Sequence, residues 1–90
     1  MQWIDEVSAE GAYGFDQSVR VGQSRRGLWW AEVGGFRWRG NEGGYVTRRY
    51  RLSSEDARGV MILMARVRAG HMVSVSDVAQ RVTDSVQYEA

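Results

Sequence analysis

The chain has 90 residues, of which 43% are hydrophobic, and it has a formal net charge of +1 and no cysteine. This length corresponds to one small domain, residues 1–90, and the lack of cysteine excludes both a disulfide framework and a cysteine-based zinc site. No apolar run approaches the roughly 20 residues that span a bilayer, and the first residues lack a basic region followed by an apolar run, so we expect a cytoplasmic protein without a membrane partner.

The first predicted element is a short helix over residues 2–10. Trp3, Ile4 and Val7 fall on one side of it at helical spacing. A helix of this length depends on docking against the rest of the chain.

A first strand is predicted at about 13–21. Val19 and Val21 alternate with Arg20, so the two valines would face the core and the arginine would face away from it. Gln17 interrupts the apolar side, which favours an edge strand.

The segment 28–39 reads as two short runs joined at Gly34-Gly35, the signal of a two-residue β-hairpin. Residues directly opposite each other in a hairpin share a face, so placing Val33 opposite Phe36 assigns every side chain. The predicted core side carries Trp29, Ala31, Val33, Phe36 and Trp38, and the predicted outer side carries Trp30, Glu32, Arg37 and Arg39.

A second turn at 40–44 leads to a strand at about 45–52. Tyr45, Thr47, Arg49 and Arg51 alternate along it and would join the outer side. Arg48 falls on the inner side, where we expect it at a periphery or paired with an acid.

Two helices follow, at about 54–69 and 76–86. Ser53 is the predicted N-cap of the first, whose apolar middle predicts that it is mostly buried. Ser74 or Ser76 would cap the second. The fold class is therefore α+β: a single domain with a three-stranded antiparallel sheet backed by helices.

Positive charge is concentrated on this predicted sheet. The span 20–51 has eight arginines and two acids, whereas the rest of the chain has four arginines and nine acids. All twelve basic residues are arginine, which binds phosphate bidentately and stacks on aromatic rings. The candidate binding residues are Arg25, Arg26, Trp30, Arg37, Arg39, Tyr45, Arg49 and Arg51.

These residues predict a non-enzymatic protein that binds nucleic acid or a nucleoprotein complex through cations and stacking rings. The alternative is a merely solvated sheet, in which Trp30 and Arg39 form a cation–π pair and Glu32 and Arg37 an ion pair. A homodimer through the same face is a further alternative.

Other motifs favour structural roles. His71 is the only histidine, so neither a metal site nor a Ser-His-Asp arrangement is predicted, and we expect no catalytic residue, metal or cofactor. Paired glycines lack the strand–loop–helix context of a phosphate-binding loop. Residues 73–82 are similar to the first helix of a repressor-type helix-turn-helix, but too few residues follow for a recognition helix.

The order strand, strand, strand, helix in G-L-W-W-A-E-V, F-R-W-R and Y-V-T-R-R-Y-R-L-S-S-E-D-A resembles the three-stranded-sheet-plus-helix DNA-binding modules of AP2-type domains and phage integrase arm domains. The resemblance covers residues 27–70. It implies a sheet that enters the major groove, with Trp30, Arg37, Arg39, Arg49 and Arg51 as the matched outward positions.

In size and general character the chain is also similar to small phage or mobile-element proteins. Among these, anti-CRISPR and other counter-defence inhibitors are often single α/β domains. This similarity implies a different activity, which is inhibition of a host defence complex by protein–protein contact.

Overall fold

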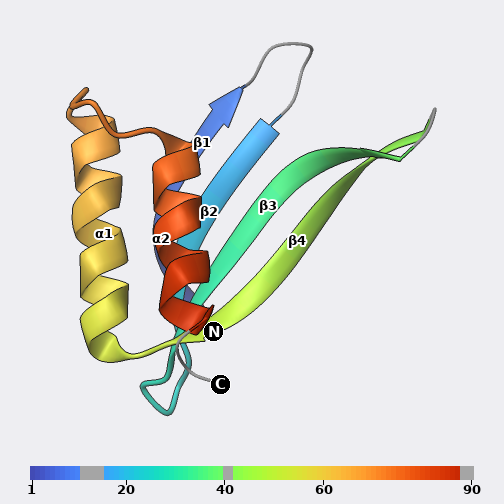
Figure 1. Ribbon diagram of the computed structural model, residues 1–90. Helices are drawn as coiled ribbons and strands as arrows, with labels where there is room; N and C mark the ends of the chain where they lie inside the picture. Colours follow the sequence, from blue (N-terminus) through green and yellow to red (C-terminus); the bar gives the residue numbers. More distant parts are fainter. Residues whose placement is uncertain (11–15, 40–41, 88–90) are drawn as a thin grey trace.

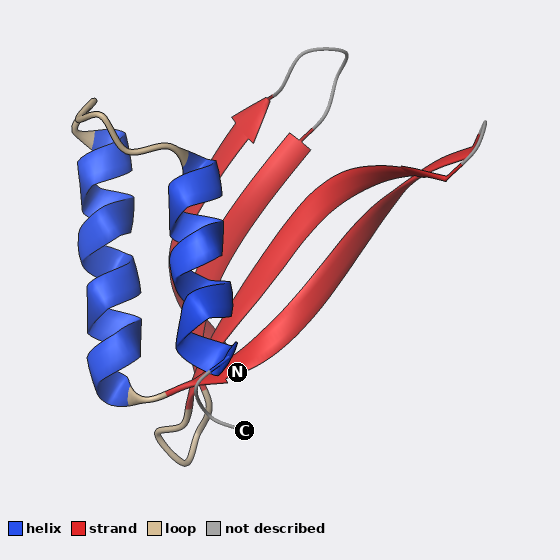
Figure 2. Ribbon diagram, in the orientation of Figure 1, coloured by secondary structure: helices blue, strands red, loops and turns tan. Residues whose placement is uncertain are grey.

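A four-stranded antiparallel sheet covered on one side by two helices makes up the fold (Figures 1 and 2). A computed structural model describes the backbone of residues 1–10, 16–39 and 42–87, and their side chains except those of 16, 36–39, 42–43 and 87. The elements are β1 (Gln2–Glu10), β2 (Asp16–Gln23), β3 (Trp29–Arg39), β4 (Glu42–Leu52), α1 (Ser54–Arg68) and α2 (Val75–Gln87). The strands lie side by side in sequence order, and α1 and α2 pack on the same face. The predicted α+β class is confirmed, with four strands instead of three.

The predicted N-terminal helix is wrong, because residues 2–10 form β1. Val7 pairs with Val19 of β2 and is buried, and a register shift lies between Trp3 and Asp5. A bulge of this kind lets a strand carry a pattern that is not strictly alternating, which is why Trp3, Ile4 and Val7 imitate helical spacing. Since β1 pairs with β2, the predicted edge strand is also wrong, and β2 lies inside the sheet.

The predicted hairpin turn at Gly34-Gly35 is wrong as well. Both glycines lie inside the continuous strand β3, which pairs through them with β2 on one side and β4 on the other. A turn there would leave those two strands without their hydrogen-bond partner. The assignment of Phe36 and Trp38 to the core depended on this turn, and their side chains lie outside the described part of the chain.

Beyond Gly35, β3 continues as a two-stranded ribbon with β4. Phe36 pairs with Tyr45, and the pairing runs on to Arg39 opposite Glu42. Figure 1 shows this ribbon curving away from the other two strands. β4 thus begins inside the segment predicted as a turn, of which residues 40–41 are not described.

The core lies between the helices and one face of the sheet. The buried apolar residues are Val7, Val19, Val21, Ala31 and Leu52 from the sheet, Ala57, Val60 and Met64 from α1, and Val75, Val78, Ala79 and Val82 from α2. Among the described side chains, Met64 is the largest that is fully buried. The prediction that this helix is mostly buried is only partly right, because Ile62 remains 57% exposed on the side away from the sheet.

Serine caps fix the starts of both helices. The Ser53 hydroxyl accepts a hydrogen bond from the Asp56 N–H at 3.1 Å, as predicted. At α2 the cap is Ser74: its hydroxyl accepts from the Asp77 N–H, and its own N–H donates to the Asp77 carboxylate at 2.8 Å. The bond from the Ser74 backbone, followed by the one involving its hydroxyl, holds the pKa of Asp77 below its ordinary value.

Ion pairs tie α1 to its neighbours. Arg68 contacts the Asp5 carboxylate of β1 at 2.6 Å, and Arg81 of α2 contacts Asp56 at 3.1 Å. In the part of the chain that the structure describes, no helix has the length and apolar character to span a bilayer.

Candidate nucleic-acid interface

The sheet face turned away from the helices, called the outer face below, is organised in rows that cross all four strands. Register places residues of one row on one face. The rows are Trp3–Gly22–Trp30–Arg51, Glu6–Arg20–Glu32–Arg49 and Ser8–Ser18–Gly34–Thr47. The intervening rows contain the buried valines, so these three rows face away from the core.

Glu32 is the centre of the middle row. Its Oε1 accepts from Arg20 Nε at 2.9 Å and lies 2.7 Å from Arg20 Nη2, and its Oε2 accepts from Arg49 Nε at 3.1 Å. The Glu32 side chain is only 13% exposed. Burial acts to raise the pKa of Glu32, but the hydrogen bonds from Arg49 and Arg20 and their charges outweigh it, so the pKa lies below its ordinary value. The carboxylate is therefore charged at neutral pH and holds two cations on the outer face.

Aromatic rings lie against these cations. The Arg20 guanidinium carbon is 3.8 Å from the centre of the Trp3 ring, and that of Arg49 is 5.5 Å from it. Arg51 lies 5.4 Å from the Trp30 ring and also donates to the Trp29 carbonyl at 3.1 Å. These cation–π contacts fix the arginines close to the sheet surface.

Two glycines leave room for aromatic rings to lie on the sheet. A Cβ at Gly22 would approach Trp3 Cε3 to 2.8 Å. A Cβ at Gly34 would collide with the Tyr45 hydroxyl and lie 2.9 Å from Ser18 Oγ. Tyr45 therefore reaches from β4 across β3, and its hydroxyl forms a 2.7 Å hydrogen bond with the Ser18 hydroxyl on β2.

A tight turn presents two more arginines beside the row that contains Trp30. Ser24 closes the turn, since its N–H donates to the Leu28 carbonyl at 2.9 Å and its carbonyl accepts from the Gly27 N–H at 3.0 Å. Gly27 has a φ of +81°, a conformation that favours glycine. Arg25 and Arg26 occupy the two central positions of this turn, and both are exposed.

The predicted residues fall into three groups. Four of them lie on the outer face, namely Trp30, Tyr45, Arg49 and Arg51, and two lie on the turn, namely Arg25 and Arg26. The remaining two, Arg37 and Arg39, belong to the ribbon, where their side chains are not described.

Trp30 and Glu32 do not have the partners that are expected for a merely solvated sheet. Trp30 is in register with Arg51 and stacks on it, and Glu32 pairs with Arg20 and Arg49. The expected pairs with Arg37 and Arg39 required the turn at Gly34-Gly35, which is absent from the described strand.

Sequence reasoning missed Trp3 and Arg20 as site residues. The sequence pattern predicts a helix at Trp3, and it predicts an outward Arg20 without connecting it to Glu32. The outward position of Arg20 next to an outward acid on the following strand was the signal available in the sequence.

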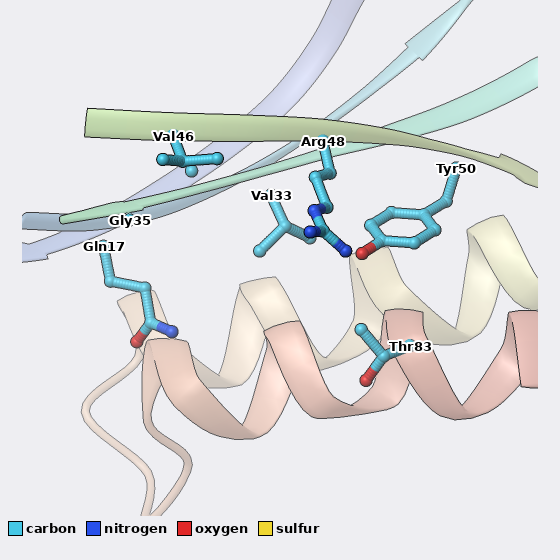
Figure 3. A pocket seen from close by; sticks show the side chains of 8 residues that line it. Gln17, Val33, Gly35, Val46, Arg48, Tyr50 and Thr83 are labelled. Atoms are coloured by element: carbon cyan, nitrogen blue, oxygen red, sulfur yellow. The ribbon is translucent and has the colours of Figure 1, made fainter. Parts of the chain in front are cut away.

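The opposite side of β3 and β4 has a shallow pocket beside α2 (Figure 3). It has a volume of about 210 Å³ and is lined by Gln17, Val33, Gly34, Gly35, Val46, Arg48, Tyr50 and Thr83. Arg48 projects from the inner face toward this space and is exposed, so it lies at the periphery, as predicted.

Comparisons with protein families, with curated proteins and with solved structures found no match to this chain. The resemblance to AP2-type and integrase arm modules therefore stays a prediction.

Proposed function

We propose that this chain is a non-enzymatic nucleic-acid-binding protein and that its interface is the outer face together with the Arg25–Arg26 turn. The observation that carries the proposal is the joint placement of arginines and aromatic rings on a sheet face that neither helix covers. Arginine forks neutralise phosphates, and exposed rings provide surfaces for bases.

The distribution of charge supports the β3–β4 side of the face as the path of the backbone. Glu6 and Glu10 lie on β1, at the far side of the sheet, whereas Arg49 and Arg51 lie on β4. The acid at the centre, Glu32, is already neutralised by two arginines. A phosphate backbone is attracted to β4 and repelled by β1.

Arg49, on this path, also has N–H groups that are available to a phosphate. Arg49 contacts Glu32 through Nε, and among the described residues no hydrogen bond engages its two Nη groups. Its side chain is about half exposed. Such a guanidinium can receive a phosphate without losing its contact with the carboxylate.

Salt dependence tests the proposal. If Arg25, Arg26, Arg49 and Arg51 each meet a phosphate, the logarithm of the binding constant for a single strand should fall with the logarithm of salt with a slope of about −3. Between 50 and 200 mM salt, affinity should then drop about 50-fold. Fluorescence anisotropy with labelled 20-nucleotide DNA measures this directly.

Variants locate the effect on the sheet. Arg51→Ala should reduce the slope by about 0.7, because one phosphate contact is lost. The matched control is Arg66→Ala, which removes an exposed arginine from α1 and should leave the slope unchanged. An equal loss in both variants, or a lack of binding to single-stranded DNA, single-stranded RNA and duplex DNA alike at 50 mM salt, would overturn the proposal.

A further inference from the structure

The outer face has rings that lie along the sheet surface instead of standing upright from it. Tyr45 bridges from β4 to Ser18 on β2, and strands are about 4.8 Å apart, so its ring must run along the surface above Gly34. Although it is anchored at its hydroxyl, Tyr45 remains 51% exposed. The exposed part of this anchored ring is available to a ligand that lies on the outer face.

Trp30 provides a second ring on the same line. It is half-buried and lies in register with Gly22, over which the Trp3 ring lies. Trp30 and Gly34 are four residues apart on β3, a separation of about 13 Å.

The cations lie between and beyond these rings. Arg49 belongs to the row midway between Trp30 and Gly34, and Arg51 belongs to the row of Trp30. Outward residues follow each other at about 6.7 Å along a strand. The path along β3 and β4 thus alternates ring, cation and ring at steps on the scale of single nucleotides in an extended strand.

We propose that the nucleic acid bound here is single-stranded, with its bases stacked on Trp30 and Tyr45 and its phosphates at Arg49, Arg51 and the Arg25–Arg26 turn. This inference depends on the proposed function, because it names the substrate class of the same face. Bases in a duplex have their faces covered by neighbouring pairs, so rings that lie along a sheet surface offer them no stacking. A single strand exposes base faces that can be received by such rings.

The arginines of the outer face are held close to the sheet surface, which also favours a single strand. Arg20 is held between Trp3 and Glu32, and Arg49 is tied to Glu32 by its Nε. Reading a duplex groove requires side chains that project from the protein into it. Arginines fastened to the sheet instead suit a strand that lies on the surface.

The first test compares labelled dT20 and rU20 with a 20-base-pair duplex by anisotropy at 50 mM salt. We expect at least one of the single strands to bind at least tenfold more tightly than the duplex. Duplex binding equal to or tighter than that of both single strands would overturn the inference but leave the proposed function intact. A lack of binding to all three probes would overturn both.

Ring variants supply the second test. Tyr45→Leu should weaken single-strand binding about 5- to 150-fold, the range for loss of one stacked base. Tyr45→Phe keeps the ring and loses only the bond to Ser18, so it should stay within about threefold of wild type. If the leucine variant binds as well as the phenylalanine variant, stacking on this ring is refuted.

A pair of glycine variants tests the geometry without changing any ring or charge. Gly34→Ala places a methyl group where the Tyr45 ring lies and should therefore lift the ring and weaken single-strand binding at least fivefold. Gly35→Ala is the matched control, because nothing lies within 4 Å of the Cβ it would add. Thermal unfolding checks that both fold, and if Gly34→Ala does not fold, the Tyr45 variants still decide the question. Equal affinity of two folded glycine variants would contradict the inference.

Discussion

Replacing Glu32 by glutamine separates a binding face from a merely stable one, because stability and affinity should move in opposite directions. Glu32 accepts hydrogen bonds from Arg20 and Arg49 at 2.9 and 3.1 Å, and it is only 13% exposed. The glutamine carbonyl can still accept a hydrogen bond from one of the two arginines, but the ion pairs with both are lost. We expect a loss of about 1 kcal/mol, the upper end for partly exposed ion pairs. In a domain of this size, that loss lowers Tm by about 4–8 °C.

The same change removes the negative charge from the centre of the outer face. With Arg20 and Arg49 no longer neutralised by Glu32, binding of a single strand should gain about one effective cation. The salt slope should become steeper by about 0.7, and affinity at 0.1 M salt should rise about fivefold. Anisotropy titrations at several salt concentrations, together with thermal unfolding followed by circular dichroism, measure both effects.

Glu55→Gln is the matched control for this variant. It adds the same charge to the protein, but at an exposed position in the first turn of α1, on the helix side of the sheet. Its salt slope should equal that of wild type. The reasoning is refuted if Glu32→Gln lowers Tm without changing affinity, or if the control raises affinity as much.

Three further predictions concern the stability of the fold. The pKa of Glu32 is lowered in the folded state, so its stabilising contribution is complete above the ordinary value of 4.5 and is lost as pH falls toward the folded pKa. In urea unfolding between pH 7 and 3, the free energy of unfolding should therefore fall less with acid in Glu32→Gln than in wild type. Ser53→Ala removes the N-cap of α1 and should cost about 1 kcal/mol in urea unfolding, whereas Ser54→Ala, one residue further on, should cost much less. Met64→Ala, at a fully buried position, should cost about 2–5 kcal/mol; a loss under 1 kcal/mol would contradict the position of the core.

Local signals in the sequence predicted the elements that depend on neighbouring residues. Ser53 caps α1 because the hydroxyl and the N–H it meets are three residues apart. Arg49 and Arg51 face outward because alternation within one strand needs no knowledge of its partners. Residue order alone therefore placed these side chains of the candidate site.

Residue order does not predict features that depend on which strands pair. Gly34-Gly35 carries a strong turn signal, yet β2 and β4 both hydrogen-bond to β3 there and keep it extended. Gly34 also matters because it has no side chain, which makes room for the Tyr45 ring. Only the register identifies that neighbour, because Tyr45 lies on another strand.

The ion pairs of Glu32 show the same limit of prediction from sequence. Its partners Arg20 and Arg49 lie 12 residues before it and 17 residues after it, on the two flanking strands. Sequence patterning places all three side chains outward, but only the register of both pairings brings them into one row.

Mapping the bound surface by NMR tests the central claim most directly. Titrating dT20 into 15N-labelled protein should shift the Trp30 indole N–H and the backbone amides of Arg49 and Arg51, while the amides around Ile62 on the exposed side of α1 stay in place. Shifts centred on α1, or a spectrum unchanged by dT20, rU20 and duplex at low salt, would contradict the assignment of the outer face as a nucleic-acid interface.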